Sequence, residues 1–173
     1  MFHIVTPQNR LQHSDLLSHL FSRTSAEDDK FDTSETVYLI AIDDTFGIIG
    51  SARLLSSPSA SLSQNCVERV GLTRDQRIWE CNKIRFLSGV LKKFGVKEEE
   101  IVALKKKFYE EFYKTLQTFA QEKAIEVYLT VTKPPMHEEL EGLGQWPFLV
   151  SSTTSHQAAS ISQEHIVGVL PVF

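Results

Sequence analysis

Cysteine is scarce in this sequence, and its spacing excludes the sites that cysteine usually builds. Cys66 and Cys81 are the only two cysteines, and no Cys-x-x-Cys pair occurs. A disulfide framework needs more cysteines, and a zinc site needs cysteine or histidine at closer spacing. We therefore expect two reduced thiols and no metal site. As a separate expectation, no tightly bound cofactor is predicted.

Long apolar runs and a positive net charge are also absent. No stretch approaches the roughly 20 apolar residues that a membrane-spanning helix needs. The N-terminal residues lack the charged and apolar regions of a signal peptide, so we expect a cytoplasmic protein with no membrane span. The net charge is −4. Because phosphate binding needs a concentrated cationic surface, this charge argues against nucleic acid as a partner.

What the sequence does contain is enough for a globular core. A chain of 173 residues, 42% of them hydrophobic, can bury a core without disulfides or metal ions. No internal repeat and no linker divides it. Residues 1–173 are therefore expected to form a single domain.

Hydrophobic periodicity predicts an α/β protein. Apolar residues at three- and four-residue steps predict a long helix over residues 98–123. Two β-type runs around an Asp/Gly turn predict an antiparallel hairpin. The remaining expected elements are helices at 13–23 and 136–143 and strands at 37–42, 48–55, 79–86, 127–132, 147–152 and 165–172. This order predicts a mixed sheet with helices packed on both faces.

Three short segments form a pattern in the first half of the chain. They are Glu27-Asp28-Asp29-Lys30-Phe31-Asp32, Gly50-Ser51-Ala52-Arg53-Leu54-Leu55 and Trp79-Glu80-Cys81-Asn82-Lys83. In this order they resemble the acyl-homoserine-lactone (autoinducer) synthases of the GNAT acyltransferase superfamily. That family has an acidic segment before its first hairpin strand, a Gly-x-x-Arg-Leu-Leu strand and a Trp-Glu-x-Ser-Arg motif.

The resemblance implies a GNAT-like three-layer α/β/α sandwich with a central, mostly antiparallel sheet. It also implies an N-acyltransferase that makes quorum-sensing signals. Such an enzyme moves an acyl group from a pantetheine thioester, on acyl carrier protein or CoA, to an amine such as S-adenosylmethionine. Glu80 is then the candidate catalytic base, because an amine must lose a proton before it attacks. Asp29 and Asp32 would hold a cationic substrate, with Arg53, Asn82 and Lys83 completing the substrate site.

The same residues also have structural explanations. Acidic residues 27–32 are typical of a solvated loop, and Glu80 paired with Arg53 or Lys83 would stabilise the fold without catalysis. A single bulge in the strand 79–86 would also change the face that Glu80 occupies.

The sequence departs from the family pattern at several positions. Asn82 and Lys83 replace the family's serine and arginine, lysine lacks the planar fork of arginine, and the upstream tryptophan is missing. The alternative function is therefore a non-catalytic GNAT-fold protein that binds an acyl ligand or a protein partner.

Residues 85–107 bear on the choice between acyl carrier protein and CoA as the donor. Residues 85–95 lack the glycine spacing of a pyrophosphate loop, and three glutamates at positions 98–100 would repel pyrophosphate from the helix start. A carrier-protein donor fits better, and Lys105, Lys106 and Lys107 are the candidate basic patch for its acidic surface. The other interpretation of these lysines is an ordinary solvated helix face.

Overall fold

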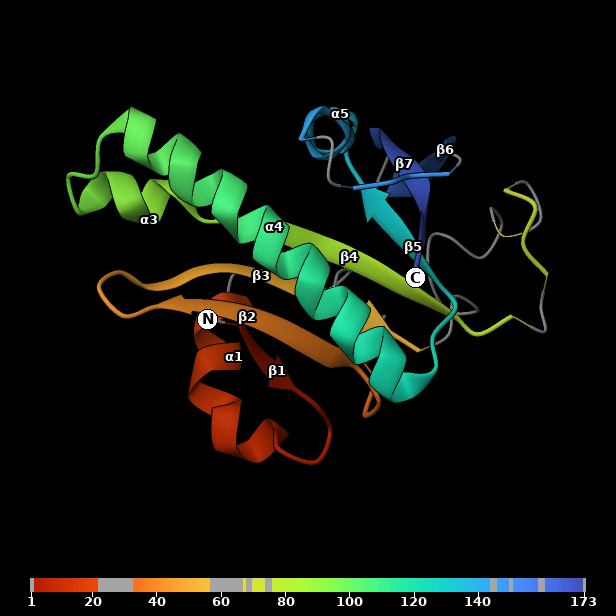
Figure 1. Cartoon of the computed structure of the whole chain (residues 1–173), viewed down its shortest axis with the longest axis horizontal. Helices are drawn as coiled ribbons and strands as arrows, with labels where there is room; N and C mark the ends of the chain where they lie inside the picture. The colour runs from red at the N-terminus through yellow and green to blue at the C-terminus, as the bar shows by residue number, and fades with distance from the viewer. Residues whose placement is uncertain are drawn as a thin grey trace.

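The computed structural model describes residues 2–21, 33–56, 67, 70–73, 76–143, 146–149, 151–158 and 161–172. Within them, one seven-stranded sheet runs in the order β1-β2-β3-β4-β5-β7-β6, with helices on both faces (Figure 1). All neighbouring strands are antiparallel except β4 and β5, which run parallel. The expected three-layer α/β/α sandwich with a mostly antiparallel sheet is confirmed.

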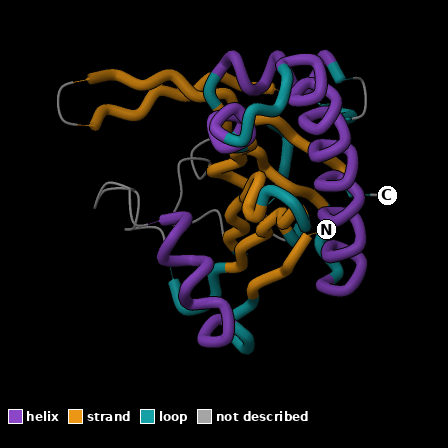
Figure 2. The backbone as a smooth tube through the Cα atoms, turned by 90° about the vertical axis from the view of Figure 1, so that its left-hand side faces the viewer, coloured by secondary structure: helices purple, strands orange, loops and turns teal. Residues whose placement is uncertain are grey.

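The strands are β1 (Phe2–Val5), β2 (Val37–Asp43), β3 (Gly47–Leu55), β4 (Ile78–Phe86), β5 (Val127–Thr132), β6 (Ser151–Ala158) and β7 (Ile161–Pro171). The helices are the 3-10 turn η1 (Arg10–His13), α1 (Ser14–Phe21), α3 (Ser88–Lys93), α4 (Glu98–Lys123) and α5 (Pro134–Gly142). Figure 2 shows the sheet between α1 and α4, with the β6–β7 hairpin projecting beyond the other elements. Among the helices of the described ranges, none has the length and apolar character needed to cross a membrane.

The predicted apolar face of α4 packs on one face of the sheet. Phe108, Phe112 and Leu116 are buried there, together with Leu54 of β3. Gly50 of β3 lies directly beneath Phe108, because a Cβ atom at this glycine would be 2.3 Å from Phe108 Cε2. A glycine at this position therefore allows the helix to approach the sheet closely.

On the opposite face of the sheet, α1 covers β1 and β2. Side chains of β2 alternate between the two layers: Leu39 and Ala41 join the α4 core, whereas Tyr38 and Ile40 pack with leucines of α1. Both faces of β2 are thus buried, which explains why its sequence is apolar at successive positions rather than alternating.

A β-bulge interrupts the pairing of β3 with β4. Arg53 pairs with Asn82, but two residues earlier on β3, Ser51 pairs with Arg85. Strand β4 therefore holds one residue more than β3 over this interval. Lys83 lies in the extra length and has a left-handed backbone, with φ of 50°. Left-handed geometry is unusual for a residue with a Cβ atom, and it costs roughly 1–2 kcal/mol.

The bulge decides which face each side chain of β4 occupies. Trp79 and Cys81 precede it, Ile84 and Phe86 follow it, and all four contact the α4 core. Without the extra residue, the side chains on one side of it would move to the opposite face. The bulge therefore keeps Glu80 on the α1 face while the second half of the strand still packs against α4.

Several elements differ from the sequence prediction. Strand β1 and helix α3 were not predicted, because four and six residues are too few to establish a hydrophobic period. The strand expected at 147–152 begins at Ser151, and the strand expected at 165–172 begins at Ile161. The polar sequence of β6 resembles a loop, but the strand forms because it pairs along its whole length with β7.

Candidate active site

Three of the predicted site residues meet at the centre of the sheet. Arg53 lies on β3 and is the cross-strand partner of Asn82 on β4. Glu80 is two residues before Asn82, so the two side chains leave β4 on the same face. That face is the one on which α1 packs against β1 and β2. The sheet register therefore brings Arg53, Asn82 and Glu80 together on one surface.

These three side chains form a hydrogen-bonded row, called here the Arg53–Asn82–Glu80 row. Arg53 Nε donates to Asn82 Oδ1 at 2.8 Å, and Asn82 Nδ2 donates to Glu80 Oε1 at 2.5 Å. Their exposed fractions are 2% for Arg53, 7% for Asn82 and 0% for Glu80. Buried charges are stable only when they are paired or hydrogen-bonded, and this row meets that need for both an arginine and a glutamate.

Asn82 is the central member of the row, although the sequence marked it only as a departure from the family pattern. A primary amide carries an acceptor oxygen and two donor hydrogens, so one side chain can accept from a guanidinium and donate to a carboxylate. The sequence left open a structural pair of Glu80 with Arg53. In the structure, the amide of Asn82 connects these two charged side chains.

The electrostatic surroundings of Glu80 disfavour a thiol nucleophile. Cys81 is fully buried, and burial, followed by the nearby Glu80 charge, raises the pKa of its thiol far above the usual range. Burial also raises the pKa of the Tyr128 hydroxyl, with a smaller contribution from Cys81. Both groups therefore stay protonated at neutral pH, and the reactive thiolate form of Cys81 is suppressed.

The other predicted substrate-binding residues are Asp29, Asp32 and Lys83. Asp29 and Asp32 lie outside the described residues. Lys83 is partly buried and occupies the bulge next to Asn82, so its backbone position, rather than the charge that the sequence emphasised, is its clearest structural feature. In the described parts of the chain, no group of three or more His, Cys, Asp or Glu side chains is placed to hold a metal ion.

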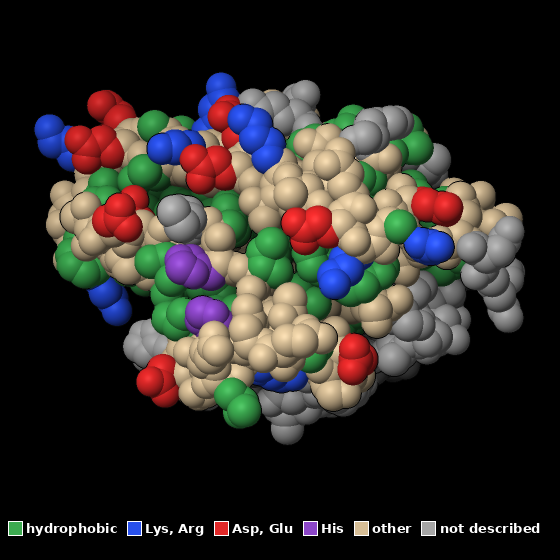
Figure 3. All heavy atoms as spheres, turned by 60° about the horizontal axis from the view of Figure 1, so that its bottom comes forward, with side chains coloured by type: hydrophobic (Ala, Val, Ile, Leu, Met, Phe, Trp, Pro, Cys, Tyr) green, Lys and Arg blue, Asp and Glu red, His purple; other side chains and the backbone are tan. Residues whose placement is uncertain are grey.

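The three predicted patch lysines do not share one helix face. Lys105 forms an ion pair with Glu139 of α5, and Lys107 forms one with Glu111 at 3.9 Å. Lys106 is exposed between them. Successive helix residues are about 100° apart, so three in a row point in different directions. Acidic and basic side chains are also interspersed on the face shown in Figure 3, with no large region of one sign.

Sequence reasoning missed two residues that extend the row across the sheet. Tyr38 of β2 is the cross-strand partner of Arg53, and its hydroxyl lies 3.5 Å from Arg10 Nη2. Both Tyr38 and Arg53 are almost fully buried on the same face. Only the register of β2 against β3 brings them together, so no local pattern would have indicated this contact.

Comparison with known proteins gives structural but not sequence relatives. No family model and no curated protein matches this sequence. Among solved structures, MesI, a CoA-dependent acyl-homoserine lactone synthase, is 18% identical with a TM-score of 0.65, over 100% of this chain and 89% of that chain. BjaI, another CoA-dependent acyl-homoserine lactone synthase, is 17% identical with a TM-score of 0.59, over 97% of this chain and 82% of that chain.

A third neighbour is an aminoglycoside 6′-acetyltransferase of type Ii. It is 13% identical with a TM-score of 0.55, over 100% of this chain and 97% of that chain. The chain has the GNAT acyltransferase fold. The predicted resemblance to acyl-homoserine lactone synthases is confirmed at the level of this GNAT fold, and the neighbours that share it include two such synthases and an aminoglycoside acetyltransferase.

Proposed function

We propose that this GNAT-fold chain is an N-acyltransferase that moves an acyl group from a pantetheine thioester to an amine, with Glu80 as the base. The observation that carries the proposal is the buried Arg53–Asn82–Glu80 row at the centre of the sheet. A carboxylate held in this way is shielded from bulk water, and its orientation is fixed by Asn82. A general base must be oriented towards the proton that it accepts, and exclusion of water strengthens its electrostatic interactions.

The chemistry proceeds in two steps. Glu80 accepts a proton from the ammonium form of the acceptor, directly or through one water molecule, and leaves a neutral amine. The amine nitrogen then attacks the thioester carbonyl carbon, the C–N bond forms, and the C–S bond breaks as the pantetheine thiol leaves with a proton. Arg53 acts as a positioning residue because it holds Asn82, which in turn holds Glu80.

The identities of the acceptor amine and the acyl donor are further parts of this proposal. S-adenosylmethionine is the first acceptor to test, because the BjaI structure contains it together with isopentyl-CoA. Asp29 and Asp32 are the proposed carboxylates for a cationic acceptor. On the donor side, MesI and BjaI are CoA-dependent, so acyl-CoA stands beside acyl carrier protein. Lys106 is the member of the proposed carrier-protein patch that forms no ion pair with a described residue.

The test is acyl transfer by a Glu80→Gln variant. Wild-type protein is incubated with acyl-CoA, acyl carrier protein and a panel of amines that includes S-adenosylmethionine, and products are measured by mass spectrometry. Loss of one general base lowers the rate by about 100- to 10,000-fold. The matched control is Glu122→Gln, which removes a carboxylate from an exposed position of α4 and should retain wild-type turnover. Equal turnover in Glu80→Gln and wild type would eliminate Glu80 as the base.

A non-catalytic binding protein is the second candidate. The observation that favours it is the complete burial of Glu80, whose carboxylate already accepts a hydrogen bond from Asn82. In that case Glu80→Gln would lower thermal stability, and no acylated product would form with any amine in the panel. Acylated product from wild-type protein would exclude this candidate.

A further inference from the structure

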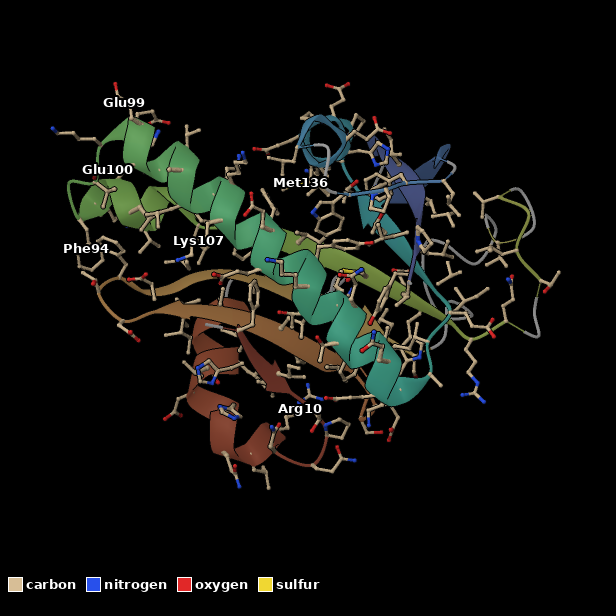
Figure 4. All side chains as sticks on the ribbon, in the orientation of Figure 1. Arg10, Phe94, Glu99, Glu100, Lys107 and Met136 are labelled. Carbon is tan, nitrogen blue, oxygen red and sulfur yellow. The ribbon has the colours of Figure 1, made fainter. Side chains whose placement is uncertain are left out.

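Two histidines from different elements lie next to each other on the α1 side of the molecule. His3 is on β1 and His13 is the last residue of η1, and their ring centres are 6.3 Å apart with 64° between the ring planes. Both side chains are partly buried and keep an accessible part. Figure 3, in which this side comes forward, shows two histidine side chains close together at the surface. Figure 4 shows Arg10, the first residue of η1, away from Met136 beside α5, so the pair is remote from α5.

The chain between the two histidines is held in place by Asn9. Its Oδ1 accepts from the Thr6 backbone N–H at 2.8 Å, and its Nδ2 donates to the Ile4 carbonyl oxygen at 3.0 Å. Its own carbonyl oxygen accepts from the backbone N–H of Gln12 at 3.0 Å, within η1. One residue thus ties the end of β1 to the turn that carries the second histidine.

Both segments are also fixed against β2. His3 is the cross-strand partner of Ile40. In η1, Arg10 Nη1 donates to the Thr33 carbonyl oxygen at 3.1 Å, and the guanidinium carbon lies 5.4 Å from the centre of the Tyr38 ring. The two imidazoles therefore project from backbone segments whose separation is set by the fold. Ligands held in this way on fixed elements lose little freedom when an ion binds.

The chemistry of such a pair is that of a metal ligand. Imidazole nitrogen binds Zn²⁺, Cu²⁺ and Ni²⁺, whereas Mg²⁺ prefers oxygen. A Zn–N bond is about 2.0–2.1 Å long, so two imidazoles on one tetrahedral ion have ring centres roughly 5 Å apart. The observed 6.3 Å is about 1 Å longer, a difference that small side-chain rotations within the staggered wells can close.

We propose that His3 and His13 bind a divalent transition-metal ion of the imidazole-preferring class, with Zn²⁺ as the probe and water as the remaining ligands. With two protein ligands, the ion would be exchangeable rather than permanently bound. It would link β1 to η1 and stabilise the layer that α1 forms on the sheet. The inference departs from the sequence expectation of no metal site, because only the fold brings these two histidines together. It does not depend on the proposed acyltransferase function, which uses neither residue.

The experiment is calorimetric titration of the untagged full chain with Zn²⁺, with thermal melting as a second measurement. A zinc concentration about 100 times Kd should raise the melting temperature by roughly 5–10 °C. His3→Gln and His13→Gln should each weaken zinc binding by about tenfold or more, because one ligand is lost. The matched control is His165→Gln, which removes a histidine from β7 and should keep the wild-type affinity. Mg²⁺ should not replace Zn²⁺.

A measurement on the wild-type chain makes the test independent of how the variants fold. In NMR spectra, zinc should shift the imidazole ring resonances of both His3 and His13. The inference is wrong if only one of the two rings responds. It is equally wrong if the chain binds no zinc at millimolar concentration, or if either folded single variant binds zinc as tightly as the wild type.

Discussion

Removing the amide of Asn82 tests whether the Arg53–Asn82–Glu80 row is held together as the structure indicates. Asn82→Ala deletes the bond from Arg53 Nε and the bond to Glu80 Oε1, while both charged partners remain buried. A hydrogen bond to a charged group contributes about 1.5–3 kcal/mol, so losing two lowers the free energy of unfolding by roughly 3–6 kcal/mol. For a domain of this size, the melting temperature falls by roughly 2–4 °C per kcal/mol, or about 6–24 °C in total.

The assay is urea unfolding followed by circular dichroism at neutral pH, with thermal melting as a second measurement. Asn9→Ala is a matched control, since Asn9 also accepts and donates through its amide. Its oxygen accepts from the Thr6 backbone N–H at 2.8 Å, and its nitrogen donates to the Ile4 carbonyl at 3.0 Å. These partners are neutral and only partly buried, so the expected loss is about 1–2 kcal/mol.

The comparison between the two alanine variants decides the outcome. If Asn82→Ala is no more destabilising than Asn9→Ala, the reasoning about buried charges in the row is refuted. A double variant adds a second check. Replacing Glu80 by Gln in the Asn82→Ala background should cost less than it does in wild type, because the row is already broken.

Two further predictions concern packing and pH. Gly50→Ala would place a Cβ atom 2.3 Å from Phe108 Cε2, so we expect a loss of about 1–3 kcal/mol in unfolding free energy, partly recovered by Phe108→Leu. Equal stability of Gly50→Ala and wild type would contradict this packing. Because burial raises the pKa values of Cys81 and Tyr128, the unfolded chain releases their protons at lower pH than the folded chain. The stability that they provide is complete below about pH 8.5, the unfolded thiol pKa, and falls as pH rises further, by up to about 1.4 kcal/mol per pH unit and group. Urea titrations from neutral to alkaline pH should show this fall in unfolding free energy. In Cys81→Ala, the part of the fall that begins near the thiol pKa should be absent. An unchanged pH profile in that variant would be evidence against the thiol as the cause.

Local sequence was sufficient for the elements with a long or strong pattern. The apolar repeat of α4 was predicted with both ends correct, because 26 residues give many turns over which one face stays apolar. The β2–β3 hairpin was predicted from two β-type runs around a turn. The edge strand β6 was misplaced, since its polar sequence has no apolar period and the strand is defined by its backbone pairing with β7.

The site was predicted less completely than the fold. The family resemblance identified Glu80, Arg53 and Asn82 as separate candidates, but it did not predict that Asn82 bridges the other two. For Lys105, Lys106 and Lys107, the sequence predicted one shared surface. The structure pairs Lys105 with α5 and Lys107 within α4, because a helix turns successive residues away from each other. Arg10 lies outside the three motifs, and its contact with Tyr38 connects it to the site.

The sequence by itself determined which segments become helices and strands and which residue types are available for chemistry. Hydrophobic periodicity encodes the buried face of each element, and this information is local. Tertiary structure decided which residues meet: the pairing of Arg53 with Asn82 joins residues 29 positions apart, and the bulge at Lys83 sets the face that Glu80 occupies. Register and bulges depend on how whole strands pack against α1 and α4, so side-chain contacts across the sheet follow only once the entire core has formed.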